Sequence, residues 1–127
     1  MSFCTAINCM DGRVQLPVIS HLKQRFLVDY VDMITEAGPV CLLGSDLESE
    51  GSFSILRRVE VSVRAHGSKA IAVVAHGDCA GNPVSENEQR EQLQRSVALL
   101  RERYPSSEVI GLWIDESWKV RELERLW

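Results

Sequence analysis

The 127-residue sequence has no apolar run approaching the roughly 18 residues that a membrane-spanning helix needs. It has no cluster of Lys and Arg beyond short pairs such as Arg57-Arg58, and its formal net charge is −4, which argues against a nucleic-acid or acidic-membrane surface. It also lacks repeats, low-complexity stretches and linkers, and residues 1–13 lack the basic start and apolar core of a secretion signal. We therefore expect a single domain over residues 1–127, located in the cytoplasm, with no membrane or nucleic-acid partner.

The chain has only four cysteines and three histidines, and the positions of the cysteines indicate what each can do. Four cysteines could form two disulfides in an oxidising compartment, but metal binding or catalysis is the commoner use in a cytosolic chain of this size. Cys4 lies inside a strand pattern and Cys41 lies in the apolar run 40–43, so both are expected to be core thiols. Cys9 and Cys79 remain as candidates for chemistry.

Strand and helix patterns alternate along the chain. The strand patterns cover residues 2–8, 31–35, 69–75 and 108–114. Helices are expected between them, the first starting at Pro17, the second ending at Gly67 and the third opened by a capping box of Ser85 and Glu88. Their apolar faces comprise Val18, Leu22 and Phe26; Ile55, Leu56, Val59 and Val63; and Leu93, Val97, Leu100 and Tyr104. Residues 44–52 are expected to form a polar loop, and residues 116–127 fit either an edge strand, with Trp118 and Val120 on one face, or a short helix.

This alternation predicts an α/β fold with a mainly parallel sheet of about four strands and helices on both faces. The flavodoxin-like strand order 2-1-3-4, with a further antiparallel edge strand as an option, puts the first and third strands side by side. Ligands bind at the carboxyl ends of such strands, where the winding direction reverses. Cys9 follows the first strand, and His76 and Cys79 follow the third. We therefore expect these three side chains to face one another across one crevice.

Two thiolates and one imidazole suit a zinc ion, one per chain, and leave its fourth coordination position for water. That pattern is typical of catalytic zinc, because the metal lowers the pKa of the water to about 7. Asp11 and Arg13 follow Cys9 closely, so the carboxylate is expected to pair with the guanidinium and leave the metal open to water. The alternative is that Asp11 is itself the fourth ligand. Asp78 is expected to be a turn former.

The segments "CMDGR" at 9–13 and "HGDC" at 76–79 resemble the paired motifs of the β-class carbonic anhydrases. Residues 34–40 are similar to that family's Asn-Ala-Gly segment, and residues 111–123 look like its late strand and the hairpin that follows. The resemblance implies reversible hydration of carbon dioxide to bicarbonate, carried out by a zinc-bound hydroxide. It also implies a homodimer or a higher homo-oligomer.

When the family's residue roles are transferred position by position, the resemblance implies that Cys9, His76 and Cys79 are the zinc ligands. It makes Asp11 and Arg13 the catalytic pair, in which the arginine holds the aspartate and the aspartate orients the hydroxide.

The sequence departs from the family pattern in three places. Glu36 stands where the family has asparagine, Ala80 stands where a glycine often follows the second cysteine, and the family's N-terminal helical arm has no counterpart before Cys9. These departures keep two alternatives open: a non-catalytic zinc-binding relative, and a hydrolase of another small carbon-sulfur substrate.

Overall fold

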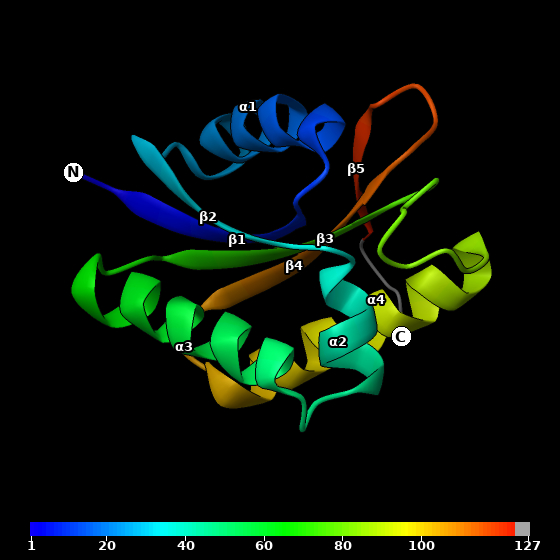
Figure 1. Ribbon diagram of the computed structural model, residues 1–127. Coiled ribbons are helices and arrows are strands. Elements are labelled where there is room, and N and C mark those ends of the chain that lie inside the picture. Colours follow the sequence, from blue (N-terminus) through cyan, green and yellow to red (C-terminus); the bar gives the residue numbers. More distant parts are fainter. Residues whose placement is uncertain (124–127) are drawn as a thin grey trace.

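The computed structural model describes residues 1–123 (Figure 1). Strands and helices alternate as the sequence predicts, except that two helices and not one separate the second and third strands and that the last two strands follow each other directly. In chain order they are β1 (Phe3–Cys9), the 3-10 turn η1 (Gly12–Val14), α1 (Gln15–Phe26), β2 (Tyr30–Glu36), α2 (Pro39–Ser45), α3 (Glu50–Ala65), β3 (Ala70–His76), α4 (Glu86–Arg103), β4 (Glu108–Ile114) and β5 (Val120–Leu123).

The strands form one sheet in the order β2-β1-β3-β4-β5. The first four are parallel, and β5 pairs with β4 in the antiparallel sense. The predicted α/β class and the order 2-1-3-4 are therefore confirmed, and the sheet has one strand more than the expected four. Of the two expectations for residues 116–127, the edge strand is found over Val120–Leu123, while Trp127 lies outside the described residues.

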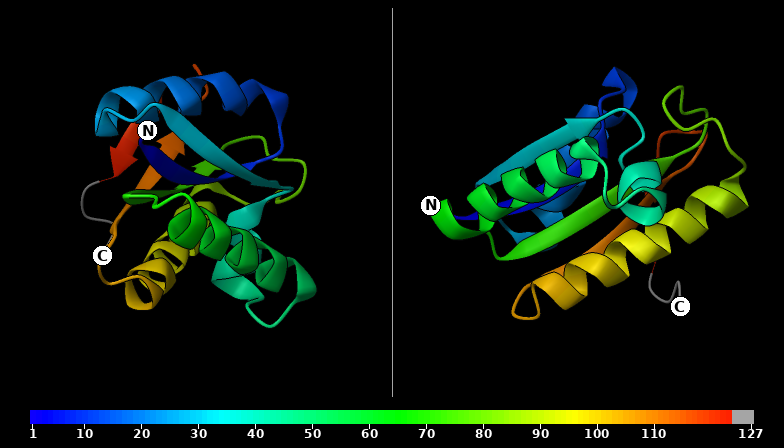
Figure 2. Two further views of the ribbon diagram at one scale, coloured as in Figure 1. Left: turned by 90° about the vertical axis from the view of Figure 1, so that its left-hand side faces the viewer. Right: turned by 60° about the horizontal axis from the view of Figure 1, so that its bottom comes forward.

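Helices cover both faces of the sheet. α1 packs on one face, and α2, α3 and α4 pack on the other (Figures 1 and 2). The predicted apolar stripe of α1, Val18, Leu22 and Phe26, is buried against the first face. Every residue of β3 is buried, as expected for a strand that is covered on both sides. In the described part of the chain, no helix has both the length and the apolar character needed to cross a membrane.

The helix boundaries differ from prediction in two places. α1 begins at Gln15, because the chain already turns through η1, and Pro17 lies in the first helical turn, where a missing N–H costs no hydrogen bond. The expected loop over 44–52 was wrong at both ends. α2 extends into it as far as Ser45, and α3 begins at Glu50, where the hydroxyl of Ser49 accepts a hydrogen bond from the Ser52 N–H.

Candidate metal centre

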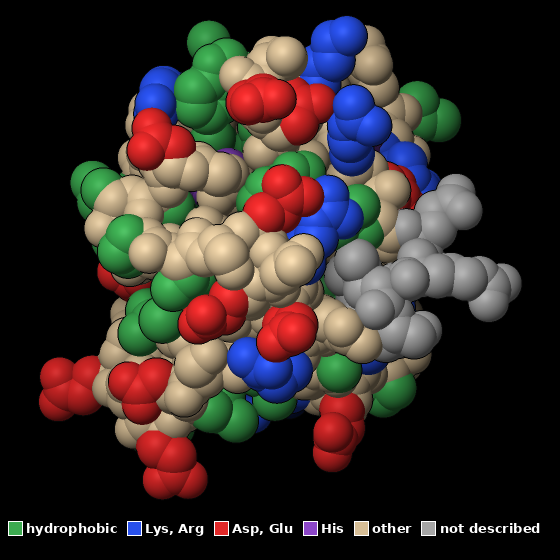
Figure 3. Space-filling model, turned by 90° about the vertical axis from the view of Figure 1, so that its right-hand side faces the viewer, with side chains coloured by type: hydrophobic (Ala, Val, Ile, Leu, Met, Phe, Trp, Pro, Cys, Tyr) green, Lys and Arg blue, Asp and Glu red, His purple; other side chains and the backbone are tan. Residues whose placement is uncertain are grey.

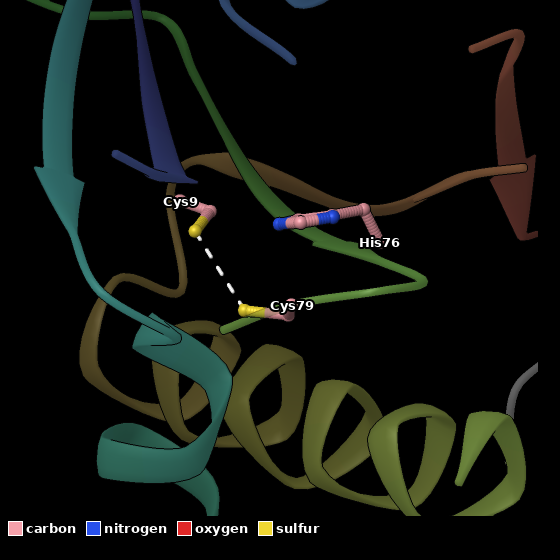
Figure 4. Close-up of side chains that lie close together, drawn as sticks. All are labelled: Cys9, His76 and Cys79. Atoms are coloured by element: carbon pink, nitrogen blue, oxygen red, sulfur yellow. Dashed lines mark hydrogen bonds between the residues drawn. The ribbon is translucent and has the colours of Figure 1, made fainter. Parts of the chain in front are cut away.

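Three potential ligands meet at the carboxyl ends of two neighbouring strands. Cys9 ends β1, His76 ends β3, and Cys79 lies in the loop that follows β3 (Figure 4). Their ligand atoms all lie within 4.8 Å of one another, and each residue is at most 4% exposed. The structure thus brings together the three side chains that the strand order predicts. Cys4 and Cys41 lie outside this group, and Cys4 is fully buried in the core.

The donor geometry fits a tetrahedral zinc ion. The Sγ atoms of Cys9 and Cys79 are 3.7 Å apart, and two zinc–sulfur bonds of about 2.3 Å at a tetrahedral angle would separate them by about 3.8 Å. The Nδ1 of His76 donates to the Gly77 carbonyl 2.6 Å away, which leaves the lone pair of Nε2 free. Nε2 is buried without a hydrogen-bond partner among the described residues, although buried polar atoms are normally paired. The imidazole ring points toward the two sulfur atoms, so a cation between them would satisfy Nε2 (Figure 4).

The two thiols differ in how readily they ionise. Burial raises the pKa of Cys9, but the nearby His76 ring and hydrogen bonds with the backbone of Gly38 and Asp11 outweigh it and lower that pKa to about 7. For Cys79, burial and the negative charge of Cys9 act together and raise the pKa to about 11. Burial lowers the pKa of His76, but the interaction with Cys9 outweighs it, so the net shift is upward. Cys79 is therefore the thiol that must give up a proton when a metal binds.

Zinc affinity is expected to rise with pH between about pH 7 and pH 10, because only the thiolate of Cys79 binds metal and its pKa is about 11. Competition with a chromophoric chelator across this range, corrected for the chelator's own protonation, measures the slope. A pH-independent affinity would contradict the assignment of Cys79 as a ligand that is protonated in the metal-free protein.

Two amide side chains, the buried Asn8 and the half-buried Gln15, shape the loop that carries Cys9. Asn8 accepts a hydrogen bond from the Cys9 N–H at 2.9 Å and donates to the Val14 carbonyl at 3.1 Å. Gln15 donates to the carbonyls of Cys9, at 2.6 Å, and Asp11, at 3.0 Å. The sequence analysis identified neither residue. The available signal of a buried polar contact was Asn8, an asparagine next to the last residue of a mostly apolar strand.

A second set of amides fixes the loop that carries Cys79. Gln89 of α4 donates to the carbonyls of His76 and Asn82, at 2.8 and 3.3 Å. Asn82 donates in turn to Gln92 of α4 at 2.7 Å. All three amide side chains belong to buried residues. Their signal in the sequence was the presence of two glutamines on the helix face that also carries Leu93 and Val97.

Gly38, in the segment between β2 and α2, packs directly on the loop that carries Cys79. Its φ is +61°, and a Cβ added there would lie 2.7 Å from the Cβ of Asn82 and 2.8 Å from the Gly81 carbonyl oxygen. Only glycine combines this backbone conformation with so close an approach. The resemblance over residues 34–40 thus corresponds to a physical contact with the loop that carries Cys79.

Gly38→Ala is expected to lower the free energy of unfolding by about 2 to 4 kcal/mol, through left-handed strain and overpacking together. Gly67→Ala is the matched control, since Gly67 has a φ of +63° but nothing within 4 Å of an added Cβ. It should lose only the strain, about 1 to 2 kcal/mol. Urea denaturation of both variants gives the comparison, and equal losses would show that the contact of Gly38 with the Cys79 loop contributes nothing.

Asp11 pairs with Arg13. The Nη2 of Arg13 is 2.6 Å from Oδ2 of Asp11, and both the side-chain Nε and the backbone N–H of Arg13 donate to Oδ1, at 3.0 and 2.9 Å. Hydrogen bonds from Arg13 lower the pKa of Asp11 to about 2, so the carboxylate is ionised at neutral pH. This is the pairing of Asp11 with Arg13 that the sequence predicts.

Arg13 has two further neighbours. Its Nη1 lies 3.3 Å from a carboxylate oxygen of Asp78, and its Cζ lies 4.6 Å from the ring centroid of Trp118. Asp78 lies in the bend after β3 with a φ of 53°, and among the described residues its side chain contacts Arg13 and not the backbone of a turn. The sequence analysis assigned neither residue a contact with Arg13.

Glu36 lies beside Cys9 in the β1–β2 register but does not belong to the group of candidate ligands. Its carboxylate accepts a hydrogen bond from the Nη2 of Arg58 in α3 at 2.8 Å. Arg58 on α3 therefore neutralises the charge of Glu36, the residue that departs from the family pattern. This departure does not place an unpaired carboxylate among the ligands.

The surface around the site carries both signs of charge. Figure 3 shows the face at the carboxyl ends of the parallel strands, where acidic and basic side chains are intermixed. A pocket of about 430 Å³ borders the loop after β3 and is lined by Asp78, Trp113 and Trp118 among others. A second pocket, of about 480 Å³, is lined by Leu47, Phe53 and Arg103 and contains none of the predicted site residues.

A protein-family model described as "Putative carbonic anhydrase" matches residues 1–124. Among curated protein sequences, none matches this one. Among solved structures, carbonic anhydrase from Streptococcus mutans is similar with a TM-score of 0.65 at 19% identity, covering 94% of this chain and 81% of that one. A β-carbonic anhydrase from Trichomonas vaginalis has a TM-score of 0.65 at 17% identity, covering 97% and 83%. A tetrameric β-carbonic anhydrase from Sordaria macrospora has a TM-score of 0.64 at 15% identity, covering 96% and 80%.

Proposed function

Because the chain belongs to the carbonic anhydrase family whose model matches residues 1–124, we propose that it catalyses the reversible hydration of carbon dioxide to bicarbonate. In this proposal Cys9, His76 and Cys79 hold one zinc ion per chain. The observation that carries it is the buried group of two sulfurs and one unpartnered imidazole nitrogen, which lies in the loops that also carry an ionised aspartate. When bound, zinc supplies Lewis acidity that lowers the pKa of a water molecule into the neutral range.

Asp11 and Arg13 supply the orientation. The Asp11 carboxylate is ionised and therefore only accepts hydrogen bonds, so it can accept one from the attacking water and direct a lone pair of that water at the carbon of carbon dioxide. Arg13 holds the carboxylate by hydrogen bonds to both oxygens and keeps it from serving as a metal ligand. The proton released in each turnover passes to buffer.

His76 contributes through its fixed tautomer. Donation from Nδ1 to the Gly77 carbonyl orients the ring and leaves Nε2 as the metal-facing atom. Gln89 donates a hydrogen bond to the backbone carbonyl of His76 and thereby fixes the backbone of that residue. The chain therefore preorganises the imidazole before a metal arrives.

Stopped-flow measurement of carbon dioxide hydration with a pH indicator tests the proposal on zinc-loaded protein. A zinc-dependent rate well above that of buffer is expected. A rate equal to that of buffer, with one zinc bound per chain, would reject the enzyme in favour of a non-catalytic zinc-binding protein. Release of hydrogen sulfide from carbonyl sulfide or carbon disulfide by the same sample would instead indicate a hydrolase of carbon-sulfur substrates.

We also propose that the protein forms a homodimer or a higher homo-oligomer. The Sordaria macrospora relative is tetrameric, and the described surface exposes large apolar side chains, including Met10, Leu16 and Tyr30. Light scattering coupled to size-exclusion chromatography measures the oligomeric state.

We also propose that the protein lies in the cytoplasm, because all four cysteines are free thiols, as is common in a reducing compartment.

A further inference from the structure

The guanidinium of Arg13 joins three loops at the carboxyl end of the sheet. It binds Asp11 in the loop after β1, and it binds both the carboxylate and the carbonyl of Asp78, each at 3.3 Å, in the loop after β3. Its Cζ lies over the indole of Trp118 in the hairpin between β4 and β5. The side chain of Arg13 is 47% exposed, so water would compete with Asp11 for the guanidinium if Asp11 were its only partner.

The two outer partners are held in an unusual backbone conformation. Asp78 and Trp118 have φ values of 53° and 62°, and among the described non-glycine residues only Leu27 shares this feature. The hairpin is braced by Asp115, whose carboxylate accepts hydrogen bonds from the N–H groups of Ser117 and Lys119 and whose carbonyl accepts from the Trp118 N–H. Such conformations persist only where the surroundings enforce them. Here they aim the carbonyl of Asp78 and the indole of Trp118 at one guanidinium.

We propose that Asp78 and Trp118 are positioning residues that keep Arg13 on Asp11 and thereby keep the fourth coordination position of the metal free. This inference rests on the proposed function, because it assumes a metal at Cys9, His76 and Cys79. Asp11 follows Cys9 by two residues, so its carboxylate has two competing partners, the guanidinium and the metal. Loss of the outer contacts frees Arg13 to turn into solvent, and the carboxylate then takes the metal.

Cobalt(II) in place of zinc makes the competition visible, because its visible absorption changes when an exogenous anion enters an open coordination position. Azide is the probe. In the double variant Asp78→Asn and Trp118→Leu, azide affinity is expected to fall about tenfold, as it would if only a tenth of the sites remained open. Asp78→Asn removes a negative charge and so favours anion binding by electrostatics alone. A fall in affinity therefore has the opposite sign to a simple charge effect.

The Asp11→Ala substitution identifies the competing ligand. It should raise azide affinity much more in the double variant than in the wild-type chain, because in this proposal Asp11 occupies the metal only when the outer contacts of Arg13 are lost. The difference between the two effects measures the coupling of Asp11 to Asp78 and Trp118. Glu86→Gln is the matched control, since Glu86 lines the same pocket but binds Arg90. It should leave azide affinity unchanged or raise it slightly, as removal of a negative charge does by electrostatics alone.

Azide affinity equal to that of wild type in the folded variants, or an Asp11→Ala effect of the same size in both backgrounds, would overturn the inference. The two single variants and Trp118→Phe provide the same comparison should the double variant fail to fold. Absence of cobalt binding by the wild-type chain would instead reject the proposed function, so the two failures are distinguishable.

Discussion

Replacing Cys79 with alanine is expected to lower zinc affinity by at least about a hundredfold and to abolish carbon dioxide hydration. Only Cys9 and His76 would remain of the three candidate ligands, and two protein ligands do not make a stable zinc site. The fold should also loosen, because a bound metal links the loops after β1 and β3 and stabilises the native state by mass action. Zinc per chain after dialysis, measured by atomic absorption, and the thermal midpoint report the two effects.

Cys41→Ala is the matched control for this loss. Cys41 is a free thiol in α2 and lies outside the ligand group. The variant should retain one zinc per chain and the hydration rate of the wild type. Full retention of zinc by Cys79→Ala would mean that another residue holds the metal, and the ligand assignment would fail.

Replacing Asp11 with alanine is expected to lower kcat for hydration by about a hundredfold or more while zinc stays bound. In the proposed mechanism, the substitution removes the hydrogen-bond acceptor that orients the attacking water but removes no ligand, since Asp11 is held by Arg13 in the structure. The pKa of Asp11 is about 2, so the wild-type carboxylate stays ionised as pH falls from neutral toward about 4. Protonation of Asp11 should therefore not limit the rate in that range.

The metal content of Asp11→Ala separates two roles of this residue. One zinc per chain with little activity fits the orienting role. Loss of zinc together with activity would show that Asp11 is a fourth ligand, and activity close to that of wild type would show that it has no part in the reaction. Asp11→Asn, which keeps the shape but loses the charge that Arg13 binds, should fall between wild type and alanine.

The sheet order was predictable because it follows from connectivity. Parallel strands joined by helices allow few arrangements, and the winding reversal between β1 and β3 then brings Cys9 to His76 and Cys79. α2 was missed because its seven residues are an apolar run too short to show helical periodicity. The proline at its start, Pro39, was the local signal that could have indicated it.

Side-chain contacts around the site were harder to predict. The pairing of Asp11 with Arg13 follows from their spacing, but the contacts of Arg13 with Asp78 and Trp118 depend on left-handed backbone conformations in two separate loops. Residue type gives no signal for this conformation at Trp118, and at Asp78 it indicates a turn but not the contact with Arg13. The role of Gly38 likewise depends on how closely two loops approach in space.

The hydrogen bonds that Gln89 donates to His76 and Asn82, and the one that Gln92 accepts from Asn82, tie the loop after β3 to α4 more closely than chain connectivity requires. A shift of α4 along its axis is therefore expected to displace His76 and Asn82, which lie on either side of Cys79 in the chain. A disturbance at the far end of that helix, near Tyr104, is expected to reach the candidate ligands in this way without changing any of their atoms.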